Sequence, residues 1–310
     1  MHKSIKLFLI LVVVIFFSDR VISYTLTSLE REVSSGLGVG KLNHFFQLKD
    51  SVDILVFGNS RASHHVNLSG LEKSNFNIGV DGTDVSYTAA LIKTLKKKNQ
   101  LVLVHIDHNS LYKSSYKGED AKALMYKLND SKKINNFYQK YFFEDWVIAK
   151  VFRLYPYNGK FFPILKNRWL GEKHPWQLNG YEPLVVSEKQ KVIFNKIRSN
   201  QPQPLNVGIE KPLKINPLID EFINVICNTA KENSSRLVFF TSPSLSKVDA
   251  EVIQTTDSYF ADKNIVYLDN INFFSENPLN ENLWKDYTHL SNDGANFYSE
   301  HLWKELQEYY

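Results

Sequence analysis

Five short segments that are predicted to be strands, most of them apolar runs, are separated by helical patterns and constrain the fold of this chain more than any other feature. They lie at 52–57, 75–80, 101–106, 236–241 and 265–268. Short continuous apolar runs of this kind are typical of strands that are buried on both faces of a sheet. Helical patterns follow at about 62–73, 85–97, 216–233, 246–263 and 291–309. The alternation predicts an α/β fold with αβα layers, a central parallel sheet of about five strands and right-handed crossovers.

Residues 1–29 combine positive charge with an apolar run. Lys3 and Lys6 stand at the start of a run from Ile5 to Phe17, a combination typical of export signals and membrane anchors. No small-x-small cleavage site follows, and helix-compatible apolar residues continue beyond the run. We therefore expect an uncleaved, single-pass signal-anchor helix in the cytoplasmic membrane, with the remaining chain extracytoplasmic. A cleaved signal with a periplasmic or secreted product, and a buried N-terminal helix, remain alternatives.

The remaining chain is expected to contain one domain. Gly36, Gly38 and Gly40 make 30–49 a predicted linker. Residues 50–310 then form the α/β domain, with an aromatic-rich insertion of helices and loops at about 112–204. This insertion is either a cover over the carboxyl edge of the sheet or a packed helical layer.

Composition argues against several functional classes. The 37 basic and 33 acidic residues give a net charge of +4, and no basic stripe suited to nucleic acid is present. The one cysteine, Cys227, excludes an internal disulfide and a cysteine-based zinc cage. Histidines at 64, 65, 105 and 108 lack the spacing of a ligand set with a third partner. We expect no metal, no cofactor and no nucleic acid partner.

A serine follows the first apolar run. Ser60 comes directly after Gly58-Asn59, beyond the carboxyl end of the predicted strand, where open α/β sheets place their ligands. A serine becomes nucleophilic when a base accepts its proton. Asp286 and His289, three residues apart before the last helix, are suited to this task, because the carboxylate can orient the imidazole toward the serine. The structural alternatives are helix capping by Ser60 and Asp286 and a structural hydrogen bond of His289.

Other polar residues follow the predicted strands. The amide of Ser60, the amide of Gly82 and the side chain of Asn109 are candidate donors to a tetrahedral oxyanion. A plain turn glycine and an Asx-turn residue are the alternatives for Gly82 and Asn109. Arg61 is a candidate ligand for an anionic substrate group, with an ion pair as the alternative.

These segments resemble the SGNH (GDSL-like) hydrolase superfamily. Its serine block is similar to Phe57-Gly58-Asn59-Ser60, with Asn59 where many members have Asp, and its last block is similar to Asp286-Tyr287-Thr288-His289. Its glycine block resembles 77–83, with Gly82 at the oxyanion glycine. Its asparagine block, usually G-x-N-D, corresponds to Asp107-His108-Asn109-Ser110. The resemblance covers about 50–110 and 215–305 and implies a flavodoxin-like arrangement of the sheet.

Within that superfamily, the anchor and the Gly-Asn-Ser-Arg block resemble the membrane-anchored bacterial branch tied to acylation of cell-envelope polysaccharides. The resemblance implies an extracytoplasmic serine esterase or O-acyltransferase that moves an acetyl-type group on a glycan. Its implied partners are an acylated glycan or acyl donor, the bacterial membrane through the N-terminal helix, and a membrane-bound acyltransferase. Hydrolysis and transfer remain open. The alternative is a non-catalytic scaffold protein that assists polysaccharide assembly or binds glycan.

Overall fold

The computed structural model describes residues 2–171, 179–200, 209, 211–275 and 281–309. The chain forms two compact units, each assembled from two stretches. Unit 1 comprises Met1–Phe46 and Lys122–Pro175, and unit 2 comprises Gln47–Ala121 and Trp176–Tyr310. The single domain predicted for 50–310, with its insertion at 112–204, differs from this division because much of the insertion belongs with the N-terminal residues.

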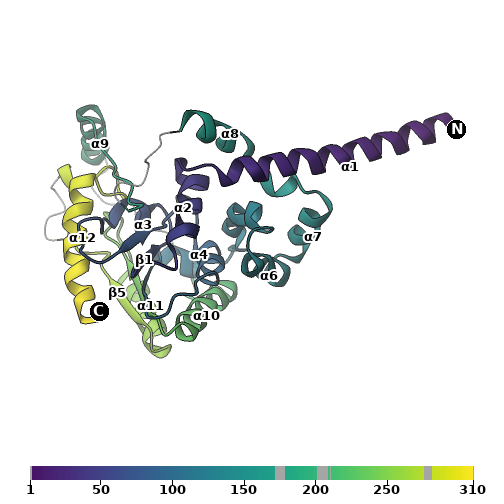
Figure 1. Ribbon diagram of the computed structural model, residues 1–310. Coiled ribbons are helices and arrows are strands. Elements are labelled where there is room, and N and C mark those ends of the chain that lie inside the picture. Colours follow the sequence, from purple (N-terminus) through teal and green to yellow (C-terminus); the bar gives the residue numbers. More distant parts are fainter. Residues whose placement is uncertain (1, 172–178, 201–208, 210, 276–280, 310) are drawn as a thin grey trace. The chain divides into compact units, whose positions relative to one another are not determined.

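Unit 2 is built on a sheet of five parallel strands (Figure 1) in the order β2-β1-β3-β4-β5. The strands are β1 (Ile54–Phe57), β2 (Asn75–Asn77), β3 (Leu101–His105), β4 (Arg236–Thr241) and β5 (Val266–Asp269). This confirms the predicted α/β class and the central parallel sheet. The order reverses between β1 and β3, so the crevice at the carboxyl ends of these two strands is the expected ligand position.

Unit 2 also contains α-helices. They are α3 (Ser60–His65), α4 (Val85–Ile92), α5 (His108–Tyr112), α9 (Glu188–Asn200), α10 (Pro217–Glu232), α11 (Ala250–Asp262) and α12 (Asn292–Leu306). Because successive strand residues point to opposite faces, Val56 and Leu103 join a core cluster with Ala62 of α3 and Tyr298 of α12. On the opposite face, the ring of Phe239 lies 5.1 Å from Phe260 of α11. The arrangement is compatible with the predicted αβα layers.

Helix α3 is shorter than the helix predicted at 62–73. The side-chain amide of Asn77, at the end of β2, donates to the carbonyls of Ala62 and Val66 at 2.8 Å each. These carbonyls lie at the C-terminal end of α3, where helix carbonyls need partners from outside the helix. Asn77 thus stabilises the early end of the helix, a long-range contact that the local pattern does not reveal.

Unit 1 is helical. It contains α1 (His2–Arg31), most of α2 (Lys41–Leu48), α6 (Lys132–Tyr141), α7 (Phe143–Val151), the 3-10 helix η3 (Tyr155–Tyr157) and α8 (Phe161–Leu170). The boundary between the two units falls inside α2, after Phe46. Its two stretches are joined by a buried network in which Lys127 Nζ donates to Glu30 Oε1 at 2.5 Å and to Asn43 Oδ1 at 2.6 Å. Burial raises the pKa of Glu30, although Lys127 opposes this effect.

Two predictions for the N-terminal region require correction. The linker predicted at 30–49 is instead largely helical: a π-helical turn spans Gly36–Gly40 and leads into α2, and Leu42 and Phe45 are buried. The three glycines indicated a loop, although the apolar residues Leu42 and Phe45 follow them at helical spacing. Within the described residues, no helix has the length and apolar character needed to cross a membrane, so the predicted membrane-spanning helix at 1–29 is not supported.

Candidate active site

Ser60 and His289 come within hydrogen-bonding distance although 229 residues separate them. Ser60 Oγ lies 2.9 Å from His289 Nε2. Ser60 is the first residue of α3, immediately beyond β1, and His289 lies shortly before α12. Both side chains are only partly buried. A nucleophile and a base are therefore adjacent and reachable from solvent at the carboxyl end of the sheet.

Asp286 and His289 stand at the two ends of a tight turn. The amide of Lys285 donates to the carbonyl of His289 at 2.9 Å, which closes the turn. Asp286 Oδ1 accepts from the backbone amides of Thr288 and His289 at 2.9 and 2.8 Å. His289 Nδ1 lies 3.1 Å from each carboxylate oxygen of Asp286. The turn thus orients the imidazole with the carboxylate on one side and Ser60 on the other.

The hydrogen bonds assign the tautomer of His289. An ionised Asp286 can only accept, so Nδ1 carries the proton and Nε2 is free to accept from the Ser60 hydroxyl. Burial by itself raises the pKa of Asp286. The hydrogen bonds from the His289 side chain and the Thr288 amide outweigh it, so that this pKa lies well below its usual range. Asp286 is therefore ionised at neutral pH, as an orienting carboxylate requires.

Gly58 makes the sharp exit from β1 that presents Ser60. Its φ of +141° lies in the region that favours glycine. A Cβ at this position would lie 2.7 Å from the Cβ of His105 and 2.9 Å from the Cβ of Ala62. Any side chain here would therefore push α3 away from β3 and displace the serine.

Helix α3 also holds the histidine turn, through His65. The amide of Leu290, next to His289, donates to His65 Nε2 at 3.0 Å. His65 Nδ1 must then carry the proton, and it donates to Ser242 Oγ at 2.9 Å. Burial, assisted by the Arg61 charge, lowers the pKa of His65 well below its usual value, so the ring is neutral. The same short helix thus positions both Ser60 and the backbone beside His289.

A partly buried ion pair lies beside the serine. The Arg61 guanidinium donates to Asp107 Oδ1 and to the carbonyl of Ser242, and it is also 3.1 Å from the carbonyl oxygen of Pro243. The Asn59 amide donates to Asp107 Oδ2 at 2.6 Å. Burial alone raises the pKa of Asp107, but Arg61, His105 and Asn59 together lower it to about 2. The guanidinium of Arg61, which the sequence suggested as a ligand for a substrate anion, is therefore bound within the protein, as in the alternative of an ion pair.

Two cavities border Ser60, and each contains one predicted oxyanion donor. A cavity of about 250 Å³ is lined by Ser60, His289 and Asn109. A second cavity, of about 550 Å³, is lined by Ser60, Gly82 and Lys113. Gly82 has a φ of +71°. The structure thus places both donors near the serine, and their joint role in one oxyanion hole stays a prediction.

Sequence reasoning missed His65 and Asp107 as parts of this site. The signal for His65 was its position five residues after the serine in a buried helix, where an unpaired histidine is costly. The signal for Asp107 was that two positions, 59 and 107, both differ from the residues usual in the SGNH blocks. No group of three His, Cys, Asp or Glu side chains suited to a metal ion occurs within the described ranges.

Comparisons with known proteins leave the family open. Neither the comparison with models of protein families nor the comparison with curated proteins finds a match for this chain. The SGNH resemblance therefore stays a prediction, and the chemistry of the site is argued from its geometry.

Proposed function

We propose that this protein is an SGNH-type serine esterase or O-acyltransferase that acts on acyl esters of a cell-envelope glycan. The observation that supports the chemistry is the chain of contacts from Ser60 Oγ to His289 Nε2 and from His289 Nδ1 to Asp286. Nucleophile, base and orienting carboxylate in this order are the requirements of acyl transfer through a covalent serine intermediate.

In the proposed reaction, Ser60 Oγ attacks the carbonyl carbon of the ester while His289 Nε2 accepts its proton. The backbone amides of Ser60 and Gly82 and the Asn109 side chain are the proposed donors to the oxyanion. Collapse of this intermediate breaks the ester bond, and His289 returns the proton to the departing alcohol. Water or a sugar hydroxyl then attacks the acyl-serine, with His289 again as base, and regenerates Ser60.

The proposed substrate and location follow the sequence features. Lys3 and Lys6 next to the exposed apolar run 5–17 favour export of the chain, and we place the site outside the cytoplasm. The partly exposed triad and the two adjoining cavities favour a substrate that approaches from solvent, such as an ester on a glycan. A membrane-bound acyltransferase is the proposed source of acyl groups if the reaction is transfer.

A fluorophosphonate probe tests the chemistry. The full chain should be labelled, and Ser60→Ala should abolish labelling because the probe reacts with an activated serine. Ser63→Ala is the matched control, since this serine of α3 is 2% exposed and should leave labelling unchanged. Absence of labelling in a folded wild-type protein would contradict the enzyme and favour the non-catalytic scaffold.

Asp286→Asn separates a catalytic turn from a structural one. An amide cannot stabilise the imidazolium or enforce the same tautomer, so turnover of an activated acetyl ester should fall by about 10³–10⁴-fold. Addition of oligosaccharide acceptors to the wild-type assay distinguishes transfer from hydrolysis, because transfer yields an acylated sugar. A loss below about tenfold in Asp286→Asn would contradict the assigned role.

A further inference from the structure

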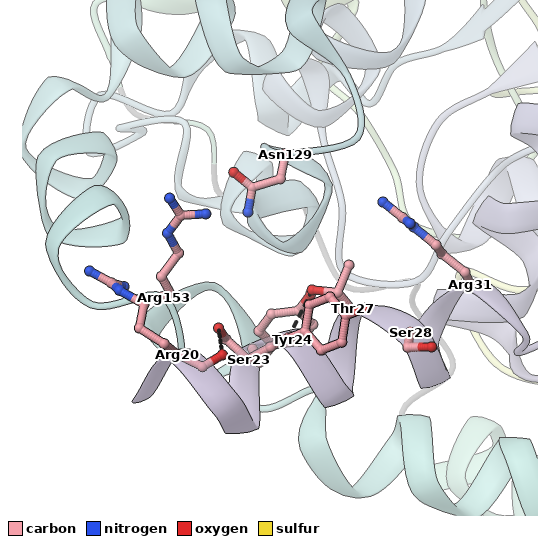
Figure 2. A pocket seen from close by; sticks show the side chains of 9 residues that line it. Arg20, Ser23, Tyr24, Thr27, Ser28, Arg31, Asn129 and Arg153 are labelled. Atoms are coloured by element: carbon pink, nitrogen blue, oxygen red, sulfur yellow. Dashed lines mark hydrogen bonds between the residues drawn. The ribbon is translucent and has the colours of Figure 1, made fainter. Parts of the chain in front are cut away.

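Unit 1 carries a basic hollow that the proposed reaction does not use. It encloses about 340 Å³ and its lining includes Arg20, Arg31 and Arg153, but no acidic side chain. Figure 2 shows the guanidinium groups of Arg20 and Arg153 near one another, with Asn129 and Ser23 also in view. A hollow with this lining is suited to an anion.

Two of the arginines are engaged and the third is not. Arg20 Nη1 lies 2.8 Å from Asp19, and Arg31 Nη2 lies 2.5 Å from Asp130. Arg153 is exposed, and its guanidinium has no polar partner among the described residues. Its backbone is nevertheless fixed, because its amide donates to Asp19 Oδ2 at 2.9 Å. The structure thus presents the Arg153 guanidinium at the hollow without a side-chain partner among the described residues.

An apolar hollow adjoins the basic one. It encloses about 750 Å³, and Ile22, Leu26 and Phe162 are among the residues that line it. Tyr157 lines both hollows, and its hydroxyl lies 2.6 Å from Thr27 Oγ1. A basic hollow next to an apolar hollow suits an amphiphile that carries an anionic group, whereas a nucleic acid or a free sugar phosphate has no long apolar part.

Large apolar side chains of unit 1 face solvent. The run 5–17 of α1 is exposed, and on α8 Phe162, Trp169 and Leu170 are 78%, 64% and 80% exposed. On α7 and directly after it, Phe143 and Phe152 are more than half exposed. Exposed apolar side chains on this scale mark a binding surface in a folded protein.

We propose that unit 1 binds the surface of an anionic phospholipid membrane, with a lipid phosphate at Arg153 in the basic hollow and the exposed side chains of α1 and α8 in the outer acyl region. Charge complementarity selects the phosphate, and the adjoining apolar hollow selects a lipid over other phosphates. Interfacial proteins combine apolar insertion with basic contacts in this way. The proposal is independent of the triad chemistry.

Vesicle binding by the full chain tests the charge. Vesicles of phosphatidylcholine with added phosphatidylglycerol should bind more tightly than phosphatidylcholine alone. Arg153→Ala should weaken binding to the anionic vesicles about fivefold, the effect of one basic residue at a membrane surface. Lys231→Ala is the matched control, because it removes one charge from an exposed position of unit 2 and should change binding less than about twofold.

Two further measurements test which surface of unit 1 enters the membrane and whether the bound anion is a lipid. Brominated lipids should quench wild-type tryptophan fluorescence more than that of Trp169→Phe. Equal binding to both vesicle types, equal effects of the two charge variants, or no quenching difference would each overturn the proposal. Release by inorganic phosphate beyond that by sodium chloride of equal ionic strength would assign the hollow to a free anion instead. Labelling of Ser60 should be unchanged in Arg153→Ala, which separates this result from the enzymatic one.

Discussion

Asn59 and Asp107 each depart from the SGNH pattern, yet they contact one another. Asn59 Nδ2 donates to Asp107 Oδ2 at 2.6 Å, while Arg61 holds the other carboxylate oxygen. An aspartate at 59 would instead place two carboxylates together, which is unfavourable in a partly buried position. The neutral amide at 59 is therefore matched to the acid at 107, and both lie next to Ser60.

Exchanging the amide of Asn59 and the carboxylate of Asp107 tests whether these two side chains depend on one another. Asn59→Asp and Asp107→Asn should each lower the free energy of unfolding by about 2–4 kcal/mol, the first through like-charge repulsion and the second through loss of the Arg61 partner. The double variant restores one carboxylate and one amide, so it should recover at least half of the summed loss. Urea unfolding of the four proteins measures the coupling; simple additivity of the two losses would refute it.

Sequence patterns identified Ser60, Asp286 and His289, which the structure brings together, but not the residues that support them. Ser60 could be found because it follows a buried strand at the predicted carboxyl edge of the sheet, and Asp286 and His289 because their spacing is local. The Arg61 guanidinium binds the carbonyls of Ser242 and Pro243, which lie more than 180 residues away in the sequence. Contacts between residues this far apart in the sequence leave no periodic signal, so the contacts of Arg61 could not be predicted.

At the scale of elements, strands were predicted better than helices. The strands β1, β3 and β4 lie in mainly apolar runs, whose signal is local, whereas β2 (Asn75–Asn77) is mostly polar. Helix ends depend on capping partners, and Asn77, which terminates α3, comes from another element. The region 30–49 was missed for a related reason: its glycines resemble a loop, and only the burial of Leu42 and Phe45 shows why it folds.

The turn between β1 and α3 should be sensitive to any side chain at 58. Gly58→Ala should lower the free energy of unfolding by about 2–4 kcal/mol and reduce probe labelling of Ser60, because the new Cβ meets both His105 and Ala62. Gly82→Ala is the matched control: its φ is also positive, but its Cβ would meet open space. There the cost should be about 1–2 kcal/mol. Similar losses in both variants would refute the close approach at Gly58.

At the scale of the whole molecule, the division into units was the least predictable feature. The two stretches of unit 1 are joined by polar contacts such as Asp19 with the amide of Leu154 and Glu30 with Lys127. Charged residues next to an apolar helix are compatible with a membrane boundary, with solvent or with a buried partner. The sequence alone does not distinguish these cases, whereas the parallel sheet of unit 2 follows from the alternation of predicted strands and helices.

Buried neutral histidines should make the whole protein sensitive to mild acid. Burial is the main cause that lowers the pKa of His65 well below 6.5 and that of His105 to about 3. In the unfolded chain both bind a proton near pH 6.5. A lowered folded-state pKa gives stability that is present above pH 6.5 and is lost as pH falls toward 3, because protons favour the unfolded state.

Urea unfolding at pH 7, 6 and 5 measures this loss. Each histidine contributes up to about 1.4 kcal/mol per pH unit below its unfolded pKa, so the two together should give about 2.7 kcal/mol per unit. His65→Gln keeps an acceptor for the Leu290 amide but cannot titrate, so its stability should be lower at pH 7 and fall about half as steeply. His301→Gln, at a side chain 38% exposed, should keep the wild-type slope. A wild-type slope in His65→Gln would show that His65 is protonated in the folded protein, and the hydrogen bond that ties α3 to the turn of His289 would then have to be abandoned.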